Sequence, residues 1–152
     1  MAGWNFAEVW DSVAREAGDR VAIVCGATTR TFAEFEDHAA RLASHFARAG
    51  ITAGDKIAID LVNRVEYLET FYAGLKLGAV PVNVNFRYGV EETRYLLADA
   101  GARVVVTEDR FAATVHAAVA LLPAGALVLE LGSTYEAAVA GDRGELVRRP
   151  DG

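Results

Sequence analysis

Cysteine is nearly absent from this sequence, because Cys25 is the only one among 152 residues. A single thiol excludes an internal disulfide and a cysteine-rich metal site. The flanking residues are apolar and none is basic, so the pattern predicts a buried structural thiol and not an activated nucleophile. One free thiol also fits a reducing compartment.

Long hydrophobic runs and an excess of positive charge are missing too. No stretch reaches about 18 uninterrupted apolar residues, so we expect no transmembrane helix. The N-terminus carries acidic residues early and lacks the basic-then-apolar order of a signal peptide. Lysine and arginine number 15 against 21 acidic residues, and they are scattered, which argues against a nucleic-acid partner. We therefore expect a cytoplasmic protein.

Sequence motifs of common catalytic sites are also absent. Neither G-x-G-x-x-G nor a Walker-type G-x-x-x-x-G-K occurs, and no serine lies in a G-x-S-x-G turn. Residues 26–29 are rich in Gly and Thr, but no lysine follows them, so they predict a hairpin turn. His38 and His45 would lie about 10.5 Å apart along one helix, too far to share a metal ion. His116 stands alone, and we expect no metal site and no catalytic residue.

The sequence does contain a regular alternation of strand and helix patterns. Residues 54–88 read as strand, crossover helix and strand. Residues 56–62 are rich in Ile and Val, as in a buried strand, and residues 79–84 supply a second buried strand. Asn63 and Glu66 resemble a capping pair at the start of the helix between them. Such a unit places its two strands parallel, with their carboxyl ends at one edge of the sheet.

The same reasoning extends to the rest of the chain. A Ser, Thr or Asn followed three residues later by Glu begins four segments, at Asn5, Thr31, Asn63 and Ser133. Further strands are expected at residues 20–25, 29–31, 103–107 and 126–131, and further helices at 90–100 and 111–122. The predicted fold is α/β, a three-layer, mostly parallel sheet flanked by helices. Residues 1–141 form the subdomain, and residues 142–152 read as a linker or truncated loop.

The carboxyl edge of this sheet is the candidate site, because open α/β sheets bind ligands there. Arg87 and Arg110 each follow a predicted parallel strand, where a guanidinium could meet a phosphate. Exposed arginines at strand ends are also common without any function. The candidate binding residues are Asn83, Asn85, Phe86, Arg87 and Arg110.

Several motifs, taken in order, resemble the AMP-forming acyl-CoA synthetases, which belong to the adenylate-forming ligase family. They lie in residues 31–35, 40–43, 50–59, 63–67 and 75–99. The ending Asn-x-Asn-Phe-Arg-Tyr at residues 83–88 looks like the fatty-acid–CoA ligase branch. The resemblance covers nearly all of residues 5–140.

This resemblance implies a fold and a two-step reaction. A carboxylic acid, expected to be a fatty acid, reacts with ATP and Mg²⁺ to give an acyl-adenylate, and coenzyme A then takes the acyl group. The family's phosphate loop and its later motifs have no match here, and Lys56 and Lys76 do not correspond to its lysines. The resemblance therefore implies an N-terminal portion of such a ligase, inactive alone, whose partner is the remainder of the chain. In homologues the strand-end loops lie near coenzyme A.

Two alternatives remain open from the sequence. The chain could be a stand-alone α/β binding or interaction module without catalysis. A flavodoxin-like small-ligand binder is disfavoured, because no phosphate-binding loop follows the first strand of the central unit. In the ligase hypothesis, an uncovered sheet edge and apolar surface predict self-association, as a homodimer.

Overall fold

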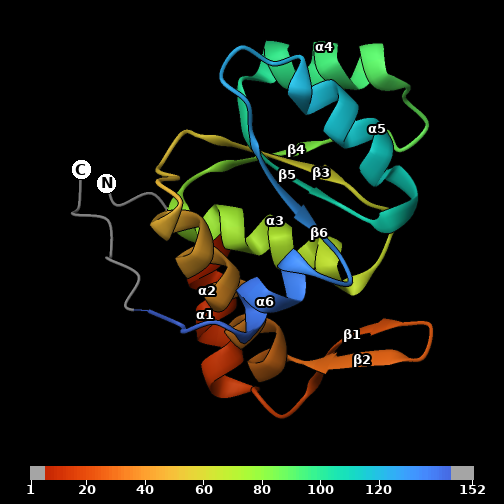
Figure 1. Cartoon of the computed structure of the whole chain (residues 1–152). Helices are drawn as coiled ribbons and strands as arrows, with labels where there is room; N and C mark the ends of the chain where they lie inside the picture. Colours follow the sequence, from red (N-terminus) through yellow and green to blue (C-terminus); the bar gives the residue numbers. More distant parts are fainter. Residues whose placement is uncertain (1–5, 145–152) are drawn as a thin grey trace.

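A parallel four-stranded sheet lies at the centre of the computed structural model, which describes residues 6–144 (Figure 1). The strands stand in the order β4-β3-β5-β6. Their bounds are Lys56–Asp60 for β3, Val80–Asn83 for β4, Ala102–Thr107 for β5 and Leu127–Glu130 for β6. All neighbouring pairs are parallel, which confirms the predicted fold class.

Six helices are described, and five of them cover the two faces of the sheet. Their bounds are α1 Phe6–Glu16, α2 Phe32–Arg48, α3 Val65–Leu77, α4 Val90–Ala100, α5 Asp109–Ala120 and α6 Thr134–Ala140. Side chains alternate along β3, so Ile57 and Ile59 join the core under α2, α3 and α6, and Ala58 joins the core under α4 and α5. Helix α1 packs through Trp10 against Phe35 of α2 and Tyr72 of α3, at centroid distances of 4.9 and 4.7 Å.

Strands β1 (Val21–Cys25) and β2 (Thr28–Thr31) form a separate antiparallel hairpin that projects from the lower part of the molecule (Figure 1). The turn is where the sequence predicts it, at Gly26 with a positive φ of 60°. The strand expected at residues 20–25 is confirmed, but its apolar sequence also predicts that it is buried, and that is wrong, since Val21 and Val24 are 57% and 69% exposed. Within the described residues the hairpin pairs only with itself, and it packs against α2 and α3 while Val21 and Val24 stay exposed.

Of the four predicted capping pairs, the one at Thr31 is confirmed. Its hydroxyl accepts a bond from the Glu34 backbone N–H, and Glu34 accepts one in return. The pair at Asn63 is wrong, because the N-cap of α3 is Arg64 and its guanidinium holds the Glu66 carboxylate at 2.8 Å. Ser133 does precede α6, but its side chain donates to the Glu130 carbonyl and caps nothing. Asn5 lies outside the described residues.

Strand β4 is an edge strand, so the prediction of a second buried strand is wrong there. Val80 is 45% exposed, and Pro81 is tolerated because an edge strand has one side without sheet partners. The helix before it ends at Gly78 in the left-handed conformation, as predicted, with φ of 69°. A Cβ at Gly74 would lie 3.3 Å from Pro81 Cγ, so glycine lets α3 approach the sheet closely.

Helix α3 buries more than the apolar stripe that its sequence predicts. Val65 is buried, but Leu68 is 40% exposed, while Glu69 and Thr70 are almost completely buried. Helix α3 packs on the sheet with one side, and on another side Glu69 bonds to α2 and α6. The spacing of apolar residues predicts that α3 packs on the sheet, but it does not predict the polar contacts of Glu69 with α2 and α6.

The confirmed capping box allows a matched test. We expect Thr31→Ala to lower the free energy of unfolding by about 1 kcal/mol, because the backbone N–H of Glu34 loses the hydroxyl that accepts its bond. Ser133→Ala should change it by a few tenths at most, since that hydroxyl caps no helix. Urea unfolding followed by circular dichroism measures both. Equal losses in the two variants would contradict the assignment.

Candidate functional site

The topological switch point of the sheet, where the order of strand addition reverses, lies between β3 and β5. From β3 the chain moves to β4 on one side, and then crosses back to β5 on the other. Ligands of open α/β sheets bind outside the carboxyl ends of the strands at such a point. Strand order cannot be read from periodicity, so the sequence selects residues after β4 and β5, Asn83 to Arg87 and Arg110, without showing that β3 and β5 are neighbours.

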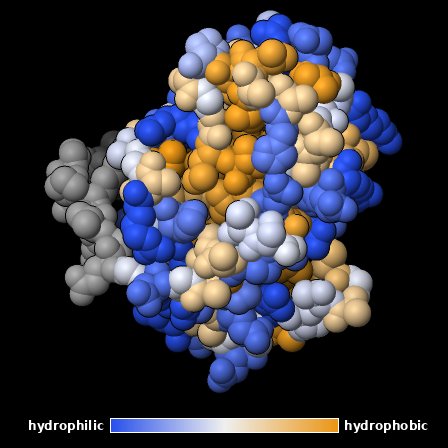
Figure 2. Space-filling model, viewed as in Figure 1, coloured by the Kyte–Doolittle hydropathy of each residue, from blue (hydrophilic) through white to orange (hydrophobic). Residues whose placement is uncertain are grey.

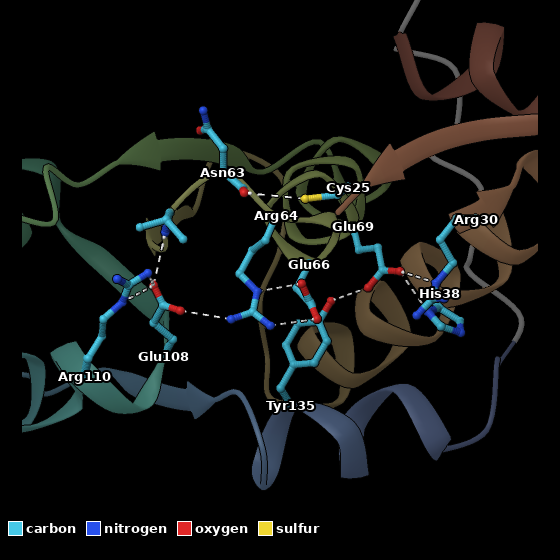
Figure 3. Close-up of polar contacts among 11 residues, drawn as sticks. Cys25, Arg30, His38, Asn63, Arg64, Glu66, Glu69, Glu108, Arg110 and Tyr135 are labelled. Carbon is cyan, nitrogen blue, oxygen red and sulfur yellow. Dashed lines mark hydrogen bonds and ion pairs between the residues drawn. The ribbon is translucent and has the colours of Figure 1, made fainter. Parts of the chain in front are cut away.

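Glu108, directly after β5, holds this region together (Figure 3). Its side chain is 8% exposed and accepts three kinds of donor. The backbone N–H of Val62 lies 3.3 Å away, the Arg64 guanidinium 2.9 Å, and Arg110 Nη2 also 2.9 Å. One carboxylate thus joins the loops after β3 and β5. Sequence reasoning missed it by assigning acidic residues to helix first turns and solvated faces.

Two adjacent hollows lie between this edge and the hairpin. The polar one has a volume of about 210 Å³ and is lined by Cys25, Thr28, Val62, Arg64, Val65, Glu66, Glu108 and Arg110. The apolar one has a volume of about 300 Å³ and is lined by Ile23, Val24, Cys25, Asn63, Arg64, Tyr67 and Leu68. Cys25 is partly exposed and contacts the Asn63 carbonyl with its sulfur at 3.7 Å, so the prediction of a buried thiol is wrong.

The charged groups of the polar hollow neutralise one another. Arg64 Nε lies 2.8 Å from Glu66 and its Nη1 lies 2.9 Å from Glu108. The hydrogen bond to Glu66 is the largest cause of the raised pKa of Arg64. Burial is the largest single influence on Glu66 and acts to raise its pKa, but the hydrogen bond and charge of Arg64, a backbone hydrogen bond and the charge of Arg30 together lower the pKa. An anion entering here must compete with two carboxylates for these guanidiniums.

The two predicted asparagines are engaged in local structure. Asn83 ends β4, and its side-chain oxygen accepts a bond from the Tyr67 hydroxyl. Asn85 accepts a bond from the backbone N–H of Arg87 at 3.1 Å, which shapes the turn after β4. Both side chains therefore position the loop that carries Phe86 and Arg87.

Phe86, Arg87 and Arg110 meet through a pair of aromatic rings. Phe86 stacks on Phe111 of α5 with 5.7 Å between centroids and 27° between planes. The Arg87 guanidinium lies 5.2 Å from the Phe86 centroid, and the Arg110 guanidinium 4.9 Å from that of Phe111. Sequence reasoning missed Phe111, because a Phe in the first turn of a helix gives no signal of a partner on another loop.

The two arginines differ in what holds them. Arg110 is 56% exposed and bonded to Glu108 through both Nε and Nη2. Arg87 is exposed and has no ion pair within residues 6–144, so its guanidinium is the one that is available to an anion.

Asp60 is a buried carboxylate at the carboxyl end of β3. It is 3% exposed, it lies beside Thr107 in the parallel register, and its Oδ1 has no hydrogen-bond partner. Burial, aided by the negative charge of Glu108, raises the pKa of Asp60 to about 6. Its charge therefore changes near neutral pH.

A second buried carboxylate ties the helices together below the edge (Figure 3). Glu69 of α3 is 1% exposed and accepts a bond from the Tyr135 hydroxyl at 2.7 Å. His38 Nδ1 lies 2.8 Å away and Arg30 Nε 3.5 Å away. Burial, and next the charge of Glu69, raises the pKa of Tyr135 well above its usual value. This cluster joins the hairpin, α2, α3 and α6, and its role is structural.

Between residues 6 and 144, no three His, Cys, Asp or Glu side chains lie close enough together to hold a metal ion. In the same range, no helix is both long enough and apolar enough to cross a membrane.

The raised pKa of Asp60 predicts a pH dependence of stability. The folded pKa of about 6 exceeds the unfolded value of 3.8, so this group favours folding at low pH and the benefit is lost as pH rises through 6. The loss amounts to roughly 2–3 kcal/mol. We expect Asp60→Asn to raise the unfolding free energy at pH 7 and to flatten its change between pH 4 and 7.

Urea unfolding at several pH values measures this, with Asp99→Asn on the exposed side of α4 as the matched control. The control should follow the native pH profile. A native protein whose stability rises through the Asp60 titration, together with an Asp60→Asn variant that is less stable at pH 7, would overturn the assignment.

A family comparison agrees with this geometry. The model of the family described as "AMP-binding enzyme" matches residues 10–147. A medium/long-chain-fatty-acid–CoA/3-oxocholest-4-en-26-oate–CoA ligase of Mycobacterium tuberculosis (strain ATCC 25618 / H37Rv) is 38% identical over 108 residues, which are 71% of this chain and 20% of that protein. A feruloyl-CoA synthase of Amycolatopsis sp is 41% identical over 118 residues, 75% of this chain and 24% of that protein.

Solved structures show the same fold. The N-terminal domain of FACL13 from Mycobacterium tuberculosis superposes with a TM-score of 0.83 at 26% identity, over 94% of this chain and 38% of that one. The anthranilate CoA ligase AuaEII superposes with a TM-score of 0.86 at 18% identity, over 91% of this chain and 27% of that one, a likeness of fold alone. The chain spans about a fifth of the length of the first of these curated relatives. With the family model covering nearly the whole described structure, this chain belongs to the family of AMP-binding, adenylate-forming enzymes.

Proposed function

We propose that this chain is the N-terminal α/β part of a cytoplasmic acyl-CoA ligase. The whole enzyme would activate a carboxylic acid with ATP to an acyl-adenylate and pass the acyl group to coenzyme A. The observation that carries the proposal is the family match over residues 10–147 together with relatives that are CoA ligases. Residues 1–141 would be one subdomain, and residues 142–152 would lead to the rest.

The acid is proposed to be a fatty acid. Support comes from the ending Asn-x-Asn-Phe-Arg-Tyr after β4 and from the fatty-acid–CoA ligase among the relatives. An aromatic acid is the second candidate, because the feruloyl-CoA synthase is 41% identical and a 2,3-dihydroxybenzoate-AMP ligase of Bacillus subtilis (strain 168), matched over 20% of its length, is 33% identical. A panel of fatty and aromatic acids offered to the whole enzyme would separate the two.

The lysines of this chain support placing the ATP phosphates and Mg²⁺ elsewhere in such an enzyme. Lys56 lies at the start of β3, the end of the strand opposite the candidate site, and its Nζ donates to the Gly54 carbonyl at 2.6 Å. Lys76 is 5% exposed and is held by Asp11 and Glu36 at 2.5 and 2.7 Å. Neither ammonium is available to a triphosphate.

The carboxyl edge of β4 and β5 is the proposed coenzyme A side. Arg87 would bind a phosphate, since it is exposed and has no ion pair in the described range. Phe86 and Phe111 would orient Arg87 and Arg110, and Asn83 and Asn85 would shape the loop. Glu108 would hold Arg110 and neutralise part of its charge.

The proposal predicts that this chain alone does not form an acyl-adenylate. With ATP, Mg²⁺ and a fatty acid, we expect no ATP–pyrophosphate exchange, because no lysine or glycine-rich loop here can hold the phosphates. ATP–pyrophosphate exchange should appear in a longer protein that contains this chain and continues past Gly152 in the same reading frame. Turnover by this chain alone would sink the proposal, and a stop codon after Gly152 would favour the stand-alone module.

A second prediction concerns coenzyme A. In calorimetric titrations we expect weak binding by this chain, at least about tenfold weaker in Arg87→Ala, because a charge-assisted bond is lost. Arg110→Ala should weaken it less, since Glu108 already holds that guanidinium. Arg15→Ala, on α1, is the matched control and should bind as the native chain does. Loss in the control, or tight binding of ATP, would contradict the assigned edge.

A further inference from the structure

Two aromatic rings join segments that lie on opposite sides of β3. In the order β4-β3-β5-β6, strand β3 separates β4 from β5, so the backbones of these two strands stand about 9–10 Å apart. Phe86, in the loop after β4, nevertheless stacks on Phe111, in the first turn of α5, with 5.7 Å between the ring centroids. Within residues 6–144, no hydrogen bond or ion pair joins residues 84–89 to residues 107–111. The ring stack therefore connects these two parts of the carboxyl edge.

Phe111 is the fixed member of the pair. Its backbone N–H donates to the Glu108 carbonyl at 2.8 Å, so it belongs to the first hydrogen-bonded turn of α5. Val115 and Ala118 of the same helix are completely buried in the core on that face of the sheet. Phe86 lies in a loop and is 40% exposed. The orientation of the Phe86 ring thus depends on Phe111 more than the reverse.

The pair carries one guanidinium over each ring. Arg87 Cζ lies 5.2 Å from the Phe86 centroid, and Arg110 Cζ lies 4.9 Å from the Phe111 centroid. Arg110 is also bonded to Glu108 through Nε and Nη2, at 3.1 and 2.9 Å, so it keeps its place without the ring. Among the described residues 6–144, the Arg87 guanidinium has no such anchor, and the aromatic face is its one restraint. Loss of Phe111 should therefore release Arg87 and leave Arg110 in place.

The restraint on Arg87 affects how strongly an anion binds there. A free arginine side chain populates many rotamers, and a bound phosphate has to select one of them. A guanidinium that is already held over a ring loses less conformational freedom when it binds. Exposed apolar surface alone has no such effect, and Figure 2 shows hydrophobic residues over the middle of the drawn face as well. The distinguishing feature of Phe86 is the cation over its ring.

We propose that Phe111 is a positioning residue for Arg87. From α5 it fixes the Phe86 ring across the end of β3, and that ring holds the Arg87 guanidinium in the place where a phosphate meets it. The inference rests on the proposed function for its ligand, coenzyme A, and adds a residue that binds no phosphate itself. Phe111 acts through Arg87 alone, although it lies next to Arg110 in the sequence.

The first test needs no ligand. Protons over the face of an aromatic ring resonate upfield of their usual position, so the Arg87 Nε–H signal in an NMR spectrum reports whether the guanidinium lies over the ring. We expect Phe111→Leu, which keeps an apolar side chain but no ring, to move this signal toward its position in free arginine. Phe111→Tyr keeps the ring and should leave the signal unchanged. Tyr95→Leu, which removes an exposed aromatic residue of α4, is the matched control and should also leave it unchanged.

Titrations with coenzyme A then measure the effect on binding. Phe111→Leu should raise the dissociation constant about three- to fivefold, the factor expected for one cation–π contact near the surface, and Phe111→Tyr should not. In a chain that already carries Arg87→Ala, Phe111→Leu should cause no further loss, because the residue through which it acts is gone. In a chain that carries Arg110→Ala, Phe111→Leu should keep its full effect. Urea unfolding shows whether each variant is folded.

Failure of this inference can be told apart from failure of the proposed function. An Arg87 signal that stays in place in Phe111→Leu overturns the inference, whatever coenzyme A does. So does an effect of Phe111→Leu that persists in the Arg87→Ala chain or disappears in the Arg110→Ala chain, since Phe111 then acts on the fold or on the other guanidinium. No binding at all, or binding that Arg87→Ala does not weaken, removes the coenzyme A edge of the proposed function and the role of Phe111 in it.

Discussion

Strand β3 is the element on which the rest of the structure depends. It lies between β4 and β5, and Ile57, Ala58 and Ile59 are completely buried. Two hydrophobic cores meet at this strand, one under α2, α3 and α6 and one under α4 and α5. Because β3 is covered on both faces and both edges, its last four residues, Asp60 among them, are buried away from water. Burial therefore raises the pKa of Asp60, which lies at the carboxyl end of β3, where the candidate site begins.

Side chains, more than backbone, hold the candidate site together at the ends of the strands. The loops after β3 and β5 have no hydrogen-bonded ladder between them, and Glu108 supplies the connection through Val62, Arg64 and Arg110. A buried charged carboxylate is stabilised by the donors around it, and three residues from two segments provide them here. The geometry of Arg110 therefore follows from Glu108, whereas within residues 6–144 the Arg87 guanidinium has the Phe86 ring as its one contact. This difference explains why one guanidinium remains available.

What could be predicted from the sequence was local. The helix over residues 90–100, the capping box at Thr31 and the left-handed end at Gly78 depend on neighbours within four residues, and each is confirmed. Strand order and burial depend on residues far away in sequence. The apolar run at residues 21–25 has the composition of a core strand, yet it pairs only with β2 and stays exposed. No periodicity distinguishes these two outcomes.

The burial of two carboxylates could not be predicted from the sequence either, because it too depends on residues far away in the chain. Glu69 and Glu108 lie in sequence positions typical of solvated helix residues, and their partners are at least 30 residues away for Glu69 and 44 for the Glu108–Arg64 pair. Their burial shows up only when α2, α3, α6 and the hairpin are assembled. Of the predicted site, Phe86, Arg87 and Arg110 do meet, but through Phe111, a residue that the strand-end argument did not include.

The hairpin and the candidate site share the polar hollow, which Cys25 and Thr28 line together with Glu108 and Arg110. Arg64 lines the apolar hollow beside β1 and the polar hollow at the switch point, and its guanidinium bonds to Glu108. Two ion pairs, Arg64–Glu108 and Glu108–Arg110, therefore connect Arg64 to Arg110. Whatever covers the hairpin changes the solvent exposure of Arg64 and thereby the strength of its ion pairs, since charge pairs strengthen as water is excluded. The electrostatics of the carboxyl edge thus depend on what lies against β1.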